Sequence, residues 1–523
     1  MAKATTKQVF KQYAPNQNLL LPPNLDELVD KQHLVRVVNE VVDQMDLTGI
    51  LNGYVGGGTS AYHPRMMIKV LLYAYAVKIY TGRRIARALR QDVTFMWLAG
   101  YNRPDFRTIN NFRSGVLKTT IEELFKQMLD FLLSYDYIRF ENYFCDGSTF
   151  EADANRYKMV WKKNAKRYQA ATEQKCKELF KQIDQLNEAE QIQYGKNDLD
   201  EAGTSGQTVT KEQIAAQSSR LDKVIATTTS KRLKRKASSL KKKLSTHQVS
   251  INKYEQQQLI SENRSGYSVT DEDATAMKMK NGEVLPGYNV LIGSEDQFIT
   301  GYSVHQKNND GACFKDHVQQ FEQHGGHEPA AIIADSIFGT QENYEIMEDK
   351  EIAAYVKFPF YHRERSRKYV ENPFRKENFA YDQASDSYIC PNNKILHFRY
   401  VKTDRSKNGY ISFSRLYECE NCKNCPLAKA CKGTSTSNRT ISFNQCLEHY
   451  KQQARNNLRS EEGDVLKRKR SIEVESCFGD IKKNQGFRRF HLRGKQKVKT
   501  EFGLIALAHN LRKIHLKNLH IAA

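Results

Sequence analysis

The stretch AAIIADSIFGT, residues 330–340, decides the fold prediction for this chain of 523 residues. It begins with an unbroken apolar run, residues 330–334, and such runs are typical of strands buried on both faces of a sheet. The run ends at Asp335. A shorter apolar run, residues 143–145 in YFCDGS, also ends at an acid, Asp146. The sequence therefore predicts two buried strands, each followed directly by an aspartate.

The segments around these two runs predict a mixed sheet with helices. Residues 288–292 and 297–304 form an expected hairpin around residues 294–296, and a helix over 312–324 connects it to the Asp335 strand. A helix over 340–350 and another buried strand, 352–358, complete the series. This order of elements is like that of a ribonuclease H fold, in which the first and fourth strands are neighbours. We therefore expect Asp146 and Asp335 to meet at one edge of the sheet.

A third acid is expected on a late helix, in KRKRSIEVESCFGDIKKNQGFRRF, residues 467–490. Arg468, Glu475 and Lys482 are spaced seven and seven, so on a regular helix they share one face, and Glu473 points elsewhere. Two carboxylates brought close repel each other unless a divalent cation lies between them, and Mg²⁺ takes only one or two protein carboxylates plus water and phosphate oxygens. The three acids therefore predict a metal site that acts on phosphate.

Three stretches resemble the motifs of DDE transposases of bacterial insertion sequences: YFCDGSTFEADANRYK (143–158), AAIIADSIFGTQENY (330–344) and VESCFGDIKKNQGFRRFHLRGKQKVKTEFGLIALAHNLRKI (474–514). The family that they resemble is the insertion-sequence eleven-eighty-two family, related to the insertion-sequence four group. The likeness runs from about Tyr62 to Lys513 and includes YHPRMMIKVLLYAY (62–75) and a cysteine cluster.

The resemblance implies that Asp146, Asp335 and Glu475 are a catalytic triad that holds two Mg²⁺ (or Mn²⁺) ions. One ion would activate water or a DNA 3′-hydroxyl, and the other would stabilise the leaving oxygen. The related group's third motif is Tyr-x₂-Arg-x₃-Glu-x₆-Lys. Glu475 and Lys482 match its last two members, but Ser471 stands at the arginine position, so Arg470 and Arg468 are the candidates to replace it. Lys482 and the arginine are expected to contact DNA phosphates.

Composition favours a polyanionic partner and argues against a membrane protein. The 81 Lys and Arg against 60 Asp and Glu give a net charge of +21, which attracts phosphates. The most apolar stretch, residues 66–80, is interrupted by Lys69 and Lys78 and is too short to span a bilayer. Residues 1–16 contain no apolar segment of a secretory signal. We expect a protein of the reducing bacterial cytoplasm, associated with the nucleoid.

The first 130 residues are predicted to be helical. Pro64 suits a first helical position, and Thr81 and Asp105 suit the caps of two short helices. These two helices could form a helix-turn-helix-like DNA reader, and the alternative is a plain helical bundle with solvated arginines. The arginines expected to contact DNA are Arg83, Arg84 and Arg87.

Residues 156–261 predict a basic helical hairpin. A helical seam runs through the later part, and a shorter matching stripe precedes it, with a polar loop over residues 196–210 between them. We expect two long antiparallel helices. Residues 231–243 hold eight Lys and Arg and no acid, which favours phosphate contact over a merely solvated face. The residues of the seam are Leu233, Ala237, Leu240, Leu244, Ile251 and Tyr254, with His247 in the gap. The residues of the earlier stripe are Cys176, Leu179, Ile183 and Leu186. The cations expected to contact phosphates are Lys231, Arg232, Lys234, Arg235, Lys236, Lys241, Lys242 and Lys243.

Five of the ten cysteines fall within residues 390–431. Clustered cysteines in a chain without an export signal indicate metal rather than disulfides. The spacing favours a tetrahedral structural Zn²⁺ over an iron–sulfur cluster, and unligated thiols are the alternative. The preferred ligands are Cys390, Cys422, Cys425 and Cys431, with Cys419 as the alternative, because this set would join a hairpin to a knuckle.

These observations predict an α+β multidomain protein. The expected domains are a helical DNA-binding domain over 1–130, a ribonuclease H-like core made of 131–155, 262–358 and 459–516, the basic hairpin over 156–261 and a Cys-rich β insertion over 359–458. The expected function is a transposase that cuts its terminal inverted repeats and joins them to target DNA as a homodimer. It would use double-stranded DNA and no small-molecule substrate. The alternatives are a nuclease that does not join ends and a domesticated, non-catalytic DNA-binding protein.

Overall fold

The computed structural model describes residues 24–54, 61–194, 209–325, 328–406, 408–432 and 437–522. Residues 1–16, considered above as a secretory signal, and most of the expected loop at 196–210 lie outside these ranges. The chain divides into two compact units, Met1–Phe112 with Leu511–Ala523, and Arg113–Asn510. Among the helices described, none has the length and apolar character needed to cross a bilayer.

The first unit is built from short helices. Its helix starts follow local capping chemistry: Pro64 is the first residue of its helix, the Thr81 hydroxyl accepts from Arg84 N–H, and the Asp105 carboxylate accepts from Thr108 N–H. The three predicted helix starts are therefore confirmed. The helices are α1 (Leu25–Leu28), α2 (Leu34–Gln44), α3 (Thr48–Leu51), α4 (Pro64–Ala76), α5 (Gly82–Gln91), α6 (Val93–Leu98), α7 (Phe106–Asn111) and the end of α18 (Lys495–Ala522).

The second unit contains a six-stranded mixed sheet. Its strand order is β4-β5-β1-β7-β8, with β6 also paired to β5. β1 pairs with β5 antiparallel and with β7 parallel, and β7 pairs with β8 parallel. The predicted neighbourhood of the first strand and the Asp335 strand is therefore confirmed. The strands are β1 (Asn142–Glu151), β4 (Thr275–Lys278), β5 (Val284–Glu295), β6 (Phe298–His305), β7 (Ala331–Ala334) and β8 (Ala353–Val356), and β2 (Met159–Trp161) pairs separately with β3 (Gly266–Ser268).

The strand β1 is longer than its apolar run predicts. It does not end at Asp146 but continues to Glu151, because β5 pairs with it along its whole second half, up to Glu151 opposite Gly287. The start of β1 is fixed by Glu295, whose carboxylate accepts backbone N–H groups from all four residues 139–142. The expectation that Asp146 terminates a strand is wrong, and this acid lies in the middle of one.

Helices cover both faces of this sheet. Side chains alternate along β1, so Tyr143 faces α12 through a hydrogen bond to His317 (2.8 Å), while Phe150 faces α17 through Phe478. The sheet is thus a middle layer, which leaves only its edges and strand ends accessible. The helices of this part are η1 (Phe112–Val116), α8 (Leu117–Ser134), η2 (Gly311–Cys313), α12 (Phe314–Gly325), η3 (Ser336–Phe338), α13 (Gln341–Asp349), α16 (Gln445–Arg459), α17 (Glu461–Gly479) and η6 (Asp480–Asn484).

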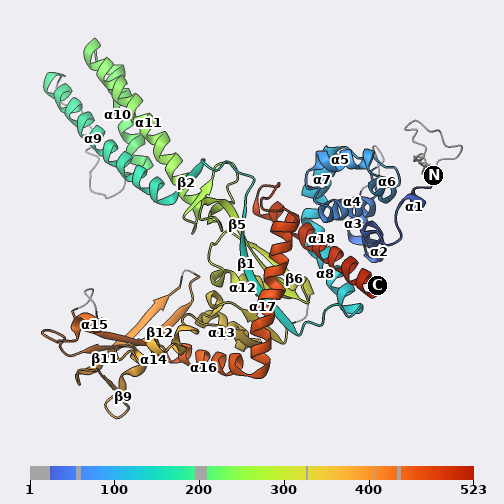
Figure 1. The fold of residues 1–523 in the computed structure, drawn as a ribbon. Helices are drawn as coiled ribbons and strands as arrows, with labels where there is room; N and C mark the ends of the chain where they lie inside the picture. The colour runs from blue at the N-terminus through green and yellow to red at the C-terminus, as the bar shows by residue number, and fades with distance from the viewer. Residues whose placement is uncertain are drawn as a thin grey trace, which may run out of the picture. The chain divides into compact units, whose positions relative to one another are not determined.

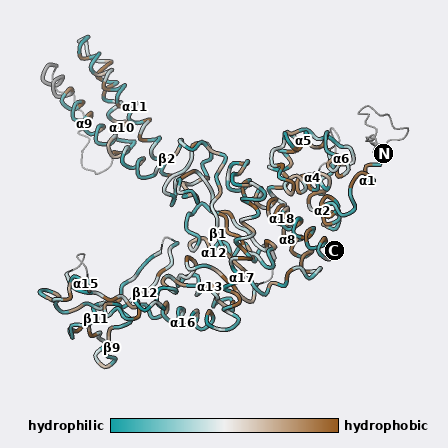
Figure 2. Tube along the Cα trace, in the orientation of Figure 1, coloured by the Kyte–Doolittle hydropathy of each residue, from teal (hydrophilic) through white to brown (hydrophobic). Residues whose placement is uncertain are grey.

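The basic insertion holds three helices rather than the two predicted. α9 (Lys162–Tyr194), α10 (Lys211–Thr227) and α11 (Lys231–Ser261) lie side by side (Figure 1). The helix that was missed, α10, begins with a capping box between Thr210 and Gln213 and buries Ile214, Leu221 and Val224 against the other two. The predicted stripe and most of the seam form this core, but Leu233, His247 and Tyr254 are only partly buried, and His247 and Tyr254 lie outside it. Figure 2 shows hydrophilic and hydrophobic residues alternating along the three helices.

The Cys-rich region forms a five-stranded sheet in the order β13-β12-β11-β10-β9. Each strand of this sheet is antiparallel to its neighbours. Its small core gathers aromatic residues and cysteines from neighbouring strands. The elements are η4 (Arg363–Arg365), α14 (Arg367–Val370), η5 (Lys376–Asn378), β9 (Ala380–Asp382), β10 (Ser387–Ile389), β11 (Ile395–Arg405), β12 (Ile411–Cys419), α15 (Ala428–Lys432) and β13 (Thr440–Phe443).

Candidate active site

Asp146 and Asp335 lie next to each other at the carboxyl end of β7. The last residue pair between β1 and β7 is Cys145 opposite Ala334, so the two aspartates are the next residues on each side. Asp335 leaves the strand and caps the turn η3 by accepting Ser336 N–H at 2.7 Å. Asp146 accepts Gly147 N–H at 2.9 Å. The sheet therefore brings together the two acids that the sequence placed after separate strands.

The surroundings of Asp146 disfavour its charged form. Burial raises the pKa of Asp146 to about 6, and the charges of Asp310 and Asp335 push it in the same direction. Gly147 N–H and the guanidinium of Arg470 act against this rise. A cation placed between the two aspartates would relieve both the burial cost and their mutual repulsion.

This raised pKa gives a prediction for Asp146→Asn. In the protein stripped of divalent ions by a chelator, the folded pKa lies above the unfolded value of 3.8, so the stability contributed by Asp146 is full below that value and is lost as the pH rises through about 6. The amide removes this loss. Asp146→Asn should therefore stabilise the chelator-treated protein at pH 8 by roughly 1–3 kcal/mol and change it little at pH 4. Thermal unfolding at both pH values tests this, and a destabilised variant at pH 8 would contradict it.

Glu475, the third predicted acid, lies on α17 and is about half exposed. One of its oxygens forms an ion pair with Arg470 at 3.2 Å. Glu473, two residues earlier, is buried and accepts Gln297 N–H at 2.7 Å, so it ties α17 to the β5–β6 turn. Because Arg470 occupies one oxygen of Glu475, that carboxylate would have to share its charge between Arg470 and any ion held by the aspartates.

The two arginine candidates have different surroundings. Arg470 is mostly buried and lies close enough to Asp146 to lower the pKa of that carboxyl, and its charge also lowers the pKa of Lys357. Arg468 is exposed, and its Nε donates to the Asp464 carbonyl oxygen. Of the two, the structure brings Arg470 to the acids.

Lys482 does not follow the helical spacing from which it was predicted. α17 ends at Gly479 and continues as a π-helical turn, Asp480–Asn484, which is wider than an α-helical turn, so the α-helical spacing assumed for Lys482 does not hold across it. Its ammonium donates to Ser148 Oγ (2.5 Å) and to the Thr149 carbonyl oxygen (2.6 Å), above the Phe150 ring. Burial, with the nearby charges of Lys280 and Arg488, lowers the pKa of Lys482 to about 7.

A fourth acid, Asp310, lies against β1 and was missed from the sequence. A Cβ atom added to Gly147 would lie only 2.5–2.7 Å from the Asp310 carboxyl atoms, so glycine is needed there. Asn289 donates to Asp310, and burial raises the pKa of the Asp310 carboxyl. Asp310 lies five residues beyond the end of β6, so it lacks the signal that identified Asp335, which directly follows its strand.

The five clustered cysteines line one cavity under the β9–β13 sheet. Three of the sulfur atoms accept hydrogen bonds: Cys390 from Lys394 N–H (3.3 Å), Cys422 from Arg439 N–H (3.3 Å) and Cys425 from the Asn392 amide (3.5 Å). Cys419 is buried at the end of β12, and burial raises the pKa of its thiol to about 12.

At the carboxylate site and at the cysteine site, the ligand atoms suit the expected ion, but the described side chains are not arranged around a metal position. Within the ranges that the structure describes, no group of three or more His, Cys, Asp or Glu side chains is arranged so that it could hold a metal ion. The carboxylates nevertheless have the oxygen donors that Mg²⁺ prefers, and the cysteines have the thiol donors that Zn²⁺ prefers. Both donor sets fit their ions chemically and would have to close around them.

The basic surfaces predicted to contact DNA are accessible. On α5 and α7, the Arg83 and Arg107 guanidinium groups lie 5.1 and 5.6 Å from the Phe106 ring, and Arg83, Arg87 and Arg90 line a groove of about 370 Å³. Arg84 is exposed on the same helix. On α11 the cations of residues 231–243 are exposed except Lys241, which pairs with Asp222.

Comparison with family models gives two matches that fit this arrangement. Residues 389–515 match a transposase DDE domain, which includes the cysteines, Glu475 and most of α18. Residues 23–115 match a second transposase domain, DUF772, which includes α1 to α7. Together they support a DDE transposase and indicate a DNA transposase function. The DDE domain implies an enzyme that cleaves and transfers nucleic acid strands with a divalent metal, typically Mg²⁺.

Comparisons with curated proteins and with solved structures gave no match. The two aspartates, Asp146 and Asp335, lie outside both matched ranges. Their assignment depends on the geometry of the sheet and on the sequence motifs.

Proposed function

We propose that this chain is the transposase of an insertion sequence, which binds the terminal inverted repeats of its element, cuts at their ends and joins the 3′-ends to target DNA. Asp146, Asp335 and Glu475 are its catalytic triad. The observation that carries the proposal is the placement of Asp146 beside Asp335 at the end of β7, with the Glu475 helix packed on the same sheet. The motifs described above support membership of the insertion-sequence eleven-eighty-two family, related to the insertion-sequence four group.

The proposed catalytic core is ribonuclease H-like. Its support is the strand order β6-β5-β1-β7-β8, in which three antiparallel strands are followed by two that are parallel to β1. This matches the order expected from the sequence, with the first and fourth strands adjacent. The proposal keeps the domain division given above, with the helical insertion entering after β1 and the Cys-rich sheet entering after β8.

The side chains of this site have separate roles. Bound between the acids, two Mg²⁺ or Mn²⁺ ions would lower the pKa of the attacking hydroxyl and neutralise the leaving oxygen. Asp146 and Asp335 hold their carboxylates at fixed positions on adjacent strands, and Glu475 supplies a third from α17. Arg470 lies beside Asp146 and can neutralise a scissile phosphate. Arg468 and Lys482 are proposed to contact the phosphates on either side of it.

We also propose that Cys390, Cys422, Cys425 and Cys431 bind a structural Zn²⁺. Thiolate ligands are stabilised by N–H donors, and three of these four sulfurs already accept one. Asn393 and Asn424 adopt left-handed conformations (φ 51° and 57°) that turn the chain back beside Cys390 and Cys422. The cavity lined by all five cysteines is the site.

The protein is proposed to act in the bacterial cytoplasm, on the nucleoid, as a homodimer that holds two DNA ends. The test is a strand-transfer assay with the full chain, Mg²⁺, a duplex taken from the DNA that flanks its gene, and a supercoiled target plasmid. A transposase should nick at the repeat boundary and join that end to the plasmid. Cleavage without joining would favour a nuclease, and binding without cleavage would favour a non-catalytic DNA-binding protein.

The basic run of α11 gives a prediction that does not depend on catalysis. Replacing the seven exposed cations of residues 231–243 with glutamine should weaken binding about equally for end DNA and random DNA, because phosphate contacts carry no base information. Each lost contact should lower the slope of log K against log salt by roughly one. Binding at several salt concentrations measures this. A variant with the wild-type slope would show that the run is a solvated helix face.

A further inference from the structure

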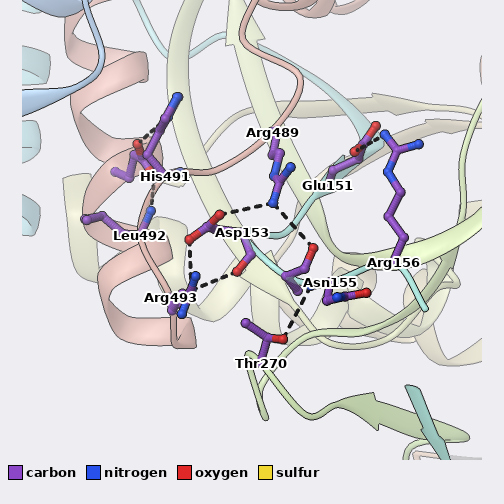
Figure 3. Close-up of polar contacts among 11 residues, drawn as sticks. Glu151, Asp153, Asn155, Arg156, Thr270, Arg489, His491, Leu492 and Arg493 are labelled. Atoms are coloured by element: carbon purple, nitrogen blue, oxygen red, sulfur yellow. Dashed lines mark hydrogen bonds and ion pairs between the residues drawn. The ribbon is translucent and has the colours of Figure 1, made fainter. Parts of the chain in front are cut away.

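The segment after the Glu475 helix carries a concentration of positive charge that the proposed catalytic site does not use. Beyond Lys482, residues 483–499 hold seven Lys and Arg and no Asp or Glu. This density is lower than that of the α11 run, but here the backbone is fixed to the catalytic sheet. Figure 3 shows the contacts of Asp153 with Arg489 and Arg493 of this segment.

The segment is joined to the far end of β1. Glu151 N–H donates to the Arg488 carbonyl oxygen at 3.0 Å, and Phe490 N–H donates to the Glu151 carbonyl oxygen at 2.9 Å, as in a short parallel bridge. His491 and Leu492 N–H donate to the buried Glu501 carboxylate. The chain from 488 to 492 is therefore held as firmly as a strand, although it lies between two helices.

Its position defines a gap in the sheet. β5 pairs with one edge of β1 throughout, and on the other edge β7 covers residues 142–145, while the segment pairs only at Glu151. Among the described residues no strand pairs with residues 146–150 on that edge, where the Lys482 ammonium donates to the Thr149 carbonyl oxygen, and Asp335 and Arg488 stand at the two ends of this gap. Five residues of strand span about 17 Å, which equals about five base pairs of duplex.

Asp153 orients two arginines of the segment. Arg493 Nε donates to Asp153 Oδ2 (2.8 Å) and to the Asp153 carbonyl oxygen (2.9 Å), and Arg489 donates to Asp153 Oδ1 at 3.1 Å. The Asp153 carboxylate is thus paired with the guanidinium groups of both Arg489 and Arg493, so these three side chains together carry a net positive charge. Because Arg493 is held through Nε, and no residue in the described ranges accepts from its Nη atoms, the outer edge of the guanidinium remains able to bind a phosphate.

Arg488 adds a cation that no acid balances. Its guanidinium is exposed, donates from Nε to the Lys482 carbonyl oxygen at 3.1 Å, and forms no ion pair with any acid in the part of the chain described. The charges of Arg488 and Lys280 also repel the Lys482 ammonium. Cations crowded in this way around an open strand edge gain from an anion that lies among them.

We propose that Arg488 and Arg493 bind the phosphate backbone of the DNA end about five base pairs from the scissile phosphate, with Asp153 as the residue that positions Arg493 and Arg489. The proposal rests on the proposed transposase function and adds a second contact point for the DNA end. This contact would set the direction in which the duplex leaves the gap between Asp335 and Arg488.

The test is phosphate-ethylation interference with the full chain on duplexes of the element's own ends, in Ca²⁺ to prevent cleavage. Wild-type protein should show interference at the cleavage site and at a second group of phosphates about five base pairs away. Arg488→Ala with Arg493→Gln should lose the second group, keep the first, and lower the salt slope by about two. Lys315→Ala, an exposed lysine on α12 across the sheet, is the matched control and should retain both groups.

The outcomes separate this inference from the proposed function. A wild-type pattern without the second group, or a double variant that retains it, overturns the inference alone. Absence of interference anywhere on the end DNA overturns the transposase proposal as well. If the double variant unfolds, Arg488→Ala decides the question by itself, because within the described residues the Arg488 side chain makes a single hydrogen bond, and its loss should leave the fold intact.

Discussion

Asp335→Ala is expected to lower the rate of DNA-end cleavage by about a thousandfold or more while the affinity for end DNA stays within a few-fold of wild type. Electrostatic stabilisation by bound metal is worth several kcal/mol of the barrier, and each 1.36 kcal/mol is a factor of ten. Binding affinity comes mainly from Lys and Arg on phosphates, which this change does not touch. Asp146→Ala and Glu475→Ala should behave in the same way.

Single-turnover cleavage and a gel shift, both on end DNA, measure the two effects separately. Asp349→Ala is the matched control, because Asp349 is an exposed acid at the end of α13 and should cut at the wild-type rate. If one of the three triad variants retains wild-type cleavage, the residue that it replaces is not catalytic. A variant that loses binding together with cleavage would indicate that the acid supports the fold instead.

The parts of the catalytic sheet that could be predicted are those fixed by apolar pattern. Residues 331–334 are apolar without interruption and buried, which is the pattern of a strand covered on both faces of the sheet. The strand β7 and the acid that follows it were therefore predicted from the sequence. The apolar pattern did not predict where the strand that contains Asp146 ends. Its strand continues through the polar residues Gly147 to Thr149 because β5 pairs with them, and long-range pairing of this kind leaves no local pattern in the sequence.

The helical spacing of Lys482 and the number of helices in the basic insertion were mispredicted for two different reasons. The seven-residue spacing from Glu475 to Lys482 assumes an α-helix throughout, and the π-helical turn after Gly479 breaks that assumption without a proline or glycine inside it as a signal. For α10 a signal was present. Thr210 and Gln213 form a capping box, and Ile214, Leu221 and Val224 follow a helical repeat, but their polar neighbours obscured it.

The positions of Arg488, Arg489 and Arg493 in the fold could not have been predicted from the sequence. The structure gives Asp153 two arginine partners more than 330 positions away along the chain, and no local pattern indicates such a pairing. A basic run shows that phosphate contact is plausible, but only the pairing of Glu151 with residues 488 and 490 fixes where along the catalytic strand that contact would occur.

The cysteine cluster supports the second large prediction. Purified protein should contain about one zinc per chain, and Cys422→Ser or Cys425→Ser should remove most of it and destabilise the β9–β13 sheet. Structural zinc contributes an apparent ~10–16 kcal/mol to folding in small domains, so a lost ligand outweighs any single contact in this small core. Cys419→Ser is the matched control and should retain zinc if Cys390 is the fourth ligand, because four thiolates then complete the tetrahedral site without Cys419.

Elemental analysis together with circular dichroism, before and after treatment with a strong chelator, measures both effects. Cys390→Ser is the decisive variant, because Cys390 lies on the β10–β11 connection and the other three proposed ligands lie after β12. If Cys390 is a ligand, the ion joins two parts of the sheet and its removal should release both. Full zinc content in Cys390→Ser would assign the site to Cys419, Cys422, Cys425 and Cys431, which would close only the loop after β12.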